Sequence, residues 1–177
     1  HRCLCDALCP PRSVVCGLSS LGAAASLPAT RVAARVTETD LMVKTADGMA
    51  DAVLFHPARR GAWPAVLMWP DILGLRPVFR EMGRRLAAQG YTVLVPNPFY
   101  RTRRAPIVTC PFDFNDKAAV AKLFELKATL TDAGVASDAS AFLKFLDQQK
   151  QVDRRTGAGV QGYCFSGPFA FPHAAVP

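Results

Sequence analysis

The sequence predicts an α/β fold built on a mainly parallel sheet that helices cover on both faces. Two apolar runs without polar alternation, at 65–69 and 91–95, are typical of strands buried on both faces. Helical segments follow both runs, and strands that alternate with helices indicate parallel pairing. At 177 residues the chain is long enough to bury the core of one domain.

A β-hairpin is expected to open the ordered part of the chain. Residues 41–45 and 49–55 have β-like patterns and flank an Asp-Gly pair, Asp47-Gly48, which is a hairpin signal. The remaining predicted elements are helices at 79–87, 116–130 and 135–146 and strands at 65–69, 91–95 and 157–161. In such a sheet, functional sites form beyond the carboxyl ends of the strands.

Residues 1–36 differ in composition from the rest of the chain. They hold four of the six cysteines and four arginines against a single acidic residue. The spacing C-x-C-x3-C-x6-C lacks the paired arms of ordinary zinc sites, so we predict neither a metal site nor a disulfide framework. We interpret this segment as a disordered leader, a non-native segment or a targeting sequence. Residues 37–177 are then the predicted α/β domain.

The net charge of +7 is carried largely by arginines that are scattered in pairs. No basic block with interleaved aromatic residues is present, so we interpret the excess as solvated surface and expect no nucleic-acid partner. No run reaches the roughly 18 apolar residues of a membrane span, and we expect a cytoplasmic protein. Nothing in the sequence predicts a cofactor, and the oligomeric state is left open.

The segment 159–167 has the spacing of a nucleophile elbow. Cys164 stands at the position of the nucleophile, with Gly162 two residues before it and Ser166-Gly167 after it. An elbow is a sharp strand-to-helix turn that strains the nucleophile's backbone, so the flanking residues must be small. A helix N-terminus also favours the reactive thiolate. The alternative for Cys164 is an inert buried thiol.

None of the three histidines is predicted to be the base that such a thiol needs. His1 is terminal, and His56 is expected in a turn at the far end of the sheet. His173 lies nine residues after Cys164, about 13 Å along a helix at ~1.5 Å per residue, whereas a base must come within ~3 Å. Cys110, which lies in a predicted loop, is interpreted as incidental.

Three segments, in this order, resemble the dienelactone hydrolase family, which are α/β-hydrolases with a cysteine nucleophile. The segments are Trp-Pro-Asp-Ile-Leu-Gly-Leu at 69–75, Gly-Tyr-Thr-Val-Leu-Val-Pro-Asn-Pro-Phe-Tyr-Arg at 90–101 and Gly-Tyr-Cys-Phe-Ser-Gly at 162–167. The resemblance implies an α/β-hydrolase-like sheet, Cys164 as the nucleophile and Asp71 as an acidic residue near the thiol. It also implies an oxyanion hole formed by the backbone N–H groups of Ile72 and Phe165. Asp71 as a simple turn residue is the alternative.

The resemblance further implies hydrolysis of a small ester or lactone, with no metal or cofactor. In the family the triad Asp and His follow the elbow, but only ten residues follow Gly167. The arginines that bind the substrate carboxylate in dienelactone enzymes are unmatched, and one would fall near Ala119. We therefore expect the C-terminal part of the domain to be missing and catalysis to require a downstream Asp and His. The alternative is a non-catalytic fragment or pseudoenzyme with a ligand-binding or interaction role.

Overall fold

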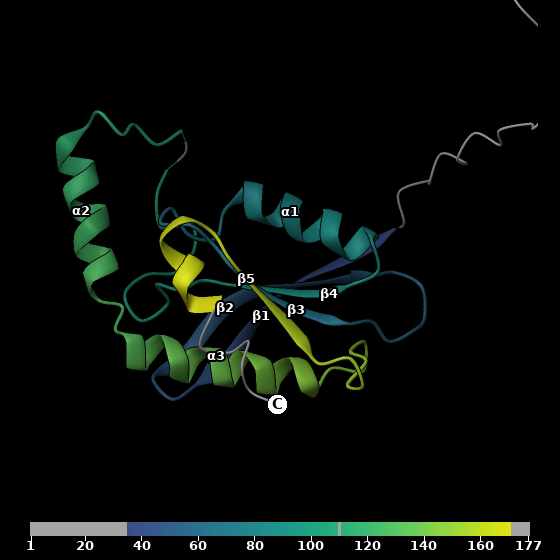
Figure 1. The fold of residues 1–177 in the computed structure, drawn as a ribbon. Coiled ribbons are helices and arrows are strands. Elements are labelled where there is room, and N and C mark those ends of the chain that lie inside the picture. Colours follow the sequence, from purple (N-terminus) through teal and green to yellow (C-terminus); the bar gives the residue numbers. More distant parts are fainter. Residues whose placement is uncertain (1–34, 110, 171–177) are drawn as a thin grey trace, which may run out of the picture. The chain divides into compact units, whose positions relative to one another are not determined.

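The computed structural model of the chain describes residues 35–109 and 111–170, and these form a five-stranded mixed sheet (Figure 1). The spatial order is β1-β2-β4-β3-β5. Strand β2 is antiparallel to both β1 and β4, whereas β3 is parallel to both β4 and β5. The strands are β1 (Val36–Thr45), β2 (Gly48–Pro57), β3 (Ala65–Trp69), β4 (Thr92–Pro96) and β5 (Ala158–Gly162). The predicted α/β class is confirmed, and the opening hairpin makes the sheet mixed rather than mainly parallel.

The predicted hairpin is present but longer than expected. Thr45 pairs with Gly48, which closes a two-residue turn, and Gly48 has φ 138°, a value that favours glycine. Strand β1 starts at Val36 rather than at residue 41, although its first residues are polar. Glu38 binds Arg80 at 2.7 Å and Arg84 at 2.6 Å, so ion pairs to a helix hold this part of the edge strand in place.

Helices α1 (Pro77–Ala88) and α3 (Asp132–Asp147) cover opposite faces of the sheet (Figure 1). Alternate strand residues supply the two cores: Val53 and Phe55 pack with α1, and Leu54 packs with α3. All five residues of β3 and of β4 are buried, as predicted for strands covered on both faces. The apolar residues that α3 contributes are Val135, Ala139, Phe142 and Leu146.

A third apolar cluster lies beyond the carboxyl edge of the sheet. Its buried members are Leu73, which follows β3, Phe99 and Ile107, which follow β4, and Leu123 of helix α2 (Lys117–Ala128). Helix α2 begins after Asp116, whose side chain accepts hydrogen bonds from two N–H groups of the first turn, so the predicted helix is confirmed. This cluster supports the segments that follow β3 and β5.

Strand β5 forms the outer edge of the sheet, and no strand among the described residues pairs with its free side. None of its residues is fully buried: Val160 and Gly162 are half-buried, and the other three are exposed. Within the described residues, no helix is both long and apolar enough to cross a membrane. His1, His173, Cys110 and the cysteines of the N-terminal segment lie outside the described residues.

Candidate active site

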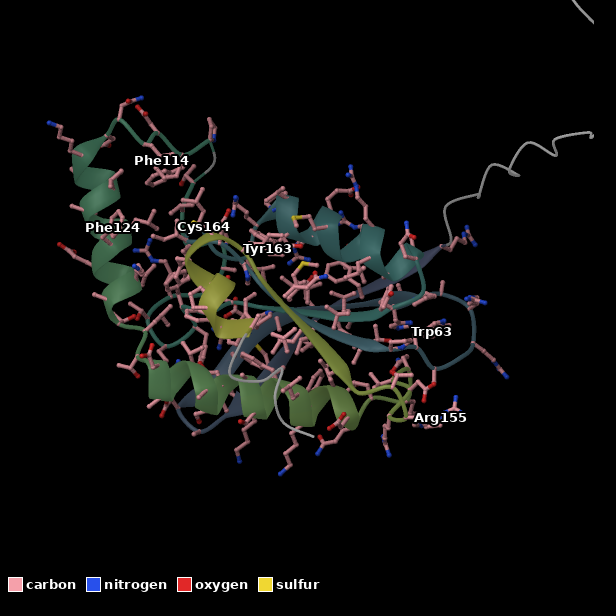
Figure 2. All side chains as sticks on the ribbon, in the orientation of Figure 1. Trp63, Phe114, Phe124, Arg155, Tyr163 and Cys164 are labelled. Atoms are coloured by element: carbon pink, nitrogen blue, oxygen red, sulfur yellow. The ribbon has the colours of Figure 1, made fainter. Side chains whose placement is uncertain are left out.

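Cys164 lies at a sharp turn directly after β5, as the spacing predicts. It has φ 58°, and among the described residues it is the one non-glycine residue with a positive φ. This left-handed conformation costs about 1–2 kcal/mol for a residue with a side chain. The thiol is exposed rather than buried, which argues against the inert-thiol alternative. Figure 2 shows Cys164 at this turn, with Tyr163 beside it.

The residues that flank Cys164 explain how the turn closes. A Cβ atom at Gly162 would lie 2.1 Å from the Ser166 carbonyl oxygen, so only glycine fits there. The buried Ser166 hydroxyl accepts a hydrogen bond from the Tyr163 N–H at 2.9 Å. Two carbonyl oxygens are within reach of its one hydrogen, that of Tyr163 at 3.0 Å and that of Trp69 at 3.1 Å. Ser166 therefore ties the turn to the end of β3. At Gly167 an added Cβ would meet no atom within 4 Å.

The segment after the turn is a 3-10 helix, η1 (Cys164–Ala170), and not the α-helix that an elbow ordinarily has. Pro168 lies inside it, and a proline interrupts the hydrogen-bond ladder that an α-helix needs. The aromatic ring of Phe165 stacks on Phe99 at 5.9 Å and contacts Phe169 edge-on at 5.4 Å. Aromatic packing thus holds the short helix against the end of the sheet.

Asp71 lies at the same edge of the sheet as Cys164. Trp69 of β3 pairs with Gly162 of β5, and Asp71 and Cys164 each follow two residues later on adjacent parallel strands. The Asp71 carboxylate binds Arg76 through both oxygens, at 2.5 and 2.8 Å, and accepts the Leu73 N–H at 3.0 Å. Within the described residues no hydrogen bond joins Asp71 to Cys164.

The two expected oxyanion-hole residues share one apolar cluster. The side chains of Ile72 and Phe165 both pack against the cluster of Leu73, Phe99, Ile107 and Leu123. Neither the Ile72 N–H nor the Phe165 N–H donates a hydrogen bond to another described residue. An N–H group without a hydrogen-bond partner among the described residues is a donor that an oxyanion can use.

A cavity of about 680 Å³ lies between the loop after β4 and helix α2. Its apolar wall includes Ile107, Leu123 and Leu126, which belong to the cluster that also contacts Ile72 and Phe165. Arg103 and Lys122 also line it. Cys164 is not one of the residues that line the cavity.

No histidine among the described residues lies at the carboxyl edge of the sheet. His56 lies in β2, one residue before the strand ends, and not in a turn; it is at the far end of the sheet, as expected, where it stacks on Trp63 at 6.4 Å. Arg76 is the residue of this site that the sequence argument missed. The only signal in the sequence was an Asp five residues before an Arg that precedes a helix-starting proline.

Comparison with known proteins identifies the family of the chain. The sequence model of the Dienelactone hydrolase family matches residues 50–177. The chain is 32% identical over 129 residues to a carboxymethylenebutenolidase of Pseudomonas sp. strain P51, covering 72% of this chain and 51% of that protein. It is 27% identical over 115 residues to the carboxymethylenebutenolidase of Rhodococcus opacus, covering 65% of this chain and 40% of that protein.

Among solved structures, a dienelactone hydrolase-like promiscuous phosphotriesterase from metagenomic libraries aligns with a TM-score of 0.57 at 21% identity. The alignment covers 76% of this chain and 52% of that structure, and it supports the fold. The chain spans about half the length of the curated relatives it matches.

Proposed function

Because this chain belongs to the dienelactone hydrolase family, we propose that it carries the nucleophile and the oxyanion hole of a hydrolase for small esters or lactones. The observation that supports this most directly is the exposed Cys164 held at φ 58°. A strained residue at the carboxyl end of a sheet strand is the arrangement that presents a nucleophile to substrate. The surrounding structure maintains this strain through Gly162 and Ser166.

The proposed reaction proceeds in two steps. The Cys164 thiolate attacks the ester carbonyl carbon, and the carbonyl oxygen becomes an oxyanion that the Ile72 and Phe165 N–H groups stabilise. The C–O bond then breaks, the alkoxide leaves and takes a proton from water, and a thioester remains on Cys164. In the second step water attacks the thioester, which releases the acid and regenerates the thiol.

The cavity between the loop after β4 and helix α2 is the proposed site for the apolar part of the substrate, because its wall belongs to the apolar cluster on which Ile72 and Phe165 pack. Its volume of about 680 Å³ lies within the range of ligand pockets, and its wall combines apolar residues with the cations Arg103 and Lys122. The expected substrate-binding arginines of the family are unmatched, so these two cations are candidates for a negatively charged substrate group. This assignment leaves the exact ester or lactone open.

The second step requires a base that activates water. No histidine of the described residues lies at this edge, so in our proposal the base and its orienting acid come from a downstream Asp and His. A second candidate function, a non-catalytic ligand-binding or interaction role, is favoured by one observation. The Asp71 carboxylate is already bound by Arg76 and Leu73, so it is not free to act as that base.

The proposal is tested with p-nitrophenyl acetate near neutral pH, using intact mass and peptide mapping. We expect at most one acetyl group per chain, located on Cys164, followed by a stalled thioester. Cys164→Ala should prevent it, and Cys164→Ala that acylates as fast as the parent chain would overturn the proposal. Sustained turnover that depends on Cys164 would show that the chain contains a base, and His173→Ala would then identify it.

A further inference from the structure

Arg76 lies in the connection between β3 and α1, where the start of the helix fixes its backbone. It immediately precedes Pro77, the first residue of α1, and a residue before proline is restricted to extended backbone angles. Arg76 accordingly has φ −149° and ψ 176°, and its carbonyl oxygen accepts the Phe79 N–H at 3.0 Å. The helix start therefore fixes the direction from which the Arg76 side chain emerges.

The Arg76 side chain is committed to one carboxylate. Its two terminal nitrogens bind the two oxygens of Asp71 at 2.5 and 2.8 Å, a paired geometry that is stronger and more directional than a single contact. The exposed fractions of the Arg76 and Asp71 side chains are 15% and 24%, so solvent screens the pair only in part. The Arg76 guanidinium also lies over the ring of Phe79, 5.2 Å from its centre.

The contact between Arg76 and Phe79 continues to the residue that precedes Cys164. The ring of Phe79 contacts Tyr163 edge-on at 5.5 Å, and Tyr163 directly precedes Cys164. The pairing of Trp69 with Gly162 independently places Asp71 and Cys164 at equal steps beyond adjacent strands. Two different sets of contacts thus put the Arg76–Asp71 pair next to the turn.

We infer that Arg76 is a positioning residue, which fixes the Asp71 carboxylate beside the turn and balances its charge so that it does not oppose formation of the Cys164 thiolate. This inference rests on the proposed function of Cys164. An unpaired carboxylate close to a thiol disfavours the thiolate by like-charge repulsion, and an unpaired guanidinium favours it. A neutral pair does neither, so the local charge at the turn depends on both members.

Other charged groups near the turn are few among the described residues. Strands β3 and β5, against which η1 packs, carry no ionisable side chain. Tyr163 adjoins Cys164, and behind the Phe165 cluster the cavity is lined by Arg103, Lys122 and Glu125, with Asp113 and Asp116 farther along. Arg76 and Asp71 are therefore the charges whose removal should act most directly on the thiol.

The test is the pH dependence of Cys164 alkylation by iodoacetamide, followed by peptide mapping that separates Cys164 from the other cysteines. Arg76→Gln should move the profile to higher pH by about half a unit, roughly threefold in rate below the midpoint. Asp71→Asn should move it to lower pH by a similar amount. The double variant should return close to the parent profile. Added salt should shrink both single shifts, since the screening length is ~10 Å at 0.1 M.

Two further variants separate charge from structure. Arg76→Lys keeps the charge but loses the paired geometry, so its profile should lie between those of the parent chain and Arg76→Gln. Arg84→Gln removes a paired arginine from the same helix, where it binds Glu38, and should leave the profile unchanged. Single variants with unchanged profiles, or shifts of the same sign, would overturn the inference. Failure of Cys164 to react in the folded parent chain would instead overturn the proposed function.

Discussion

Two ion pairs lie beyond the carboxyl edge of the sheet, Arg101–Asp138 and Arg76–Asp71. They differ in how exposed the carboxylate is and in how many segments of the chain they connect. The Asp138 side chain of α3 is only 2% exposed, and Arg101 contacts both of its oxygens at 2.7 and 2.9 Å. The Asp71 side chain is 24% exposed and is held by Arg76 from the same connection between β3 and α1. The Asp138 carboxylate is therefore buried, whereas the Asp71 carboxylate is partly exposed at the same edge of the sheet as the candidate nucleophile.

The two ion pairs also differ in how many segments of the chain they link. Asp138 accepts a hydrogen bond from Tyr100, whose hydroxyl lies 2.6 Å from Thr45, and Arg101 also binds Asp47. This network joins the β1–β2 hairpin, the loop after β4 and helix α3. The Asp71 pair spans five residues and joins no distant segments. We therefore expect the long-range network to contribute more to the stability of the fold than the local Arg76–Asp71 pair.

The largest expected effect follows from that difference. Asp138→Ala removes the partner of a partly buried arginine and leaves the Tyr100 hydroxyl without its acceptor. We expect a loss of about 3 kcal/mol in the free energy of unfolding, measured with urea. The matched variant Asp71→Ala should lose about 1 kcal/mol or less. Asp138→Asn should fall between the two, because it keeps the shape and one acceptor. Equal losses at Asp138 and Asp71 would show that the comparison is wrong.

Two glycines of the elbow offer a second contrast. Gly162→Ala would place a Cβ 2.1 Å from the Ser166 carbonyl oxygen, a backbone atom, so the turn must shift. We expect a loss of about 1–3 kcal/mol in unfolding free energy together with slower alkylation of Cys164. Gly167→Ala adds a Cβ with no atom within 4 Å and should change stability by less than ~0.5 kcal/mol. If Gly162→Ala were as stable as Gly167→Ala, the close approach in the turn would be refuted.

Local patterns were enough to predict most of the regular structure. The unbroken apolar runs gave β3 and β4, the Asp-Gly pair gave the hairpin, and helical spacing gave α1, α2 and α3. The spacing around Cys164 also predicted a turn at that residue, and the structure has it at φ 58°. Each of these features is encoded within about a dozen neighbouring residues.

The features that the sequence did not predict depend on contacts between distant segments, on a proline within a helix or on the conformation of a loop. The polar start of β1 forms a strand because Glu38 binds Arg80 and Arg84, more than forty residues away. The 3-10 form of η1 reflects Pro168 and packing of Phe165 against Phe99. The ion pair between Asp71 and Arg76 depends on the conformation of the loop between them, and residue spacing alone does not predict that conformation. Catalytic roles at Asp71, Ile72 and Phe165 stay predictions.

Alkaline pH should weaken the hydrogen-bond network of Tyr100, Asp138 and Arg101. Burial raises the pKa of Tyr100 to about 12, with the hydrogen bond between Tyr100 and Thr45 opposing the shift and the hydrogen bond to Asp138 reinforcing it. The unfolded value is near 10, so the stabilising contribution is complete below pH ~10 and is lost as the pH rises toward 12. Unfolding free energy should fall across this range, by at most ~1.4 kcal/mol per pH unit for one proton. Tyr100→Phe should be less stable at neutral pH, and its unfolding free energy should fall less steeply over this pH range. An unchanged dependence on pH would show that Tyr100 is not the group responsible.

The smallest expected effect concerns the strain at Cys164, and it has the opposite sign. A residue with a Cβ pays about 1–2 kcal/mol at φ near 60°, and glycine does not. The exposed side chain contributes little burial, while glycine adds about 0.5–1 kcal/mol of chain entropy to the unfolded state. Cys164→Gly should therefore raise the unfolding free energy by up to about 1 kcal/mol while abolishing acylation. Cys164→Ala retains the Cβ and should abolish acylation without any gain in stability. Equal stability of Cys164→Gly and Cys164→Ala would mean that the turn does not hold Cys164 under strain. The site would then not differ from the Asp138 network in being strained.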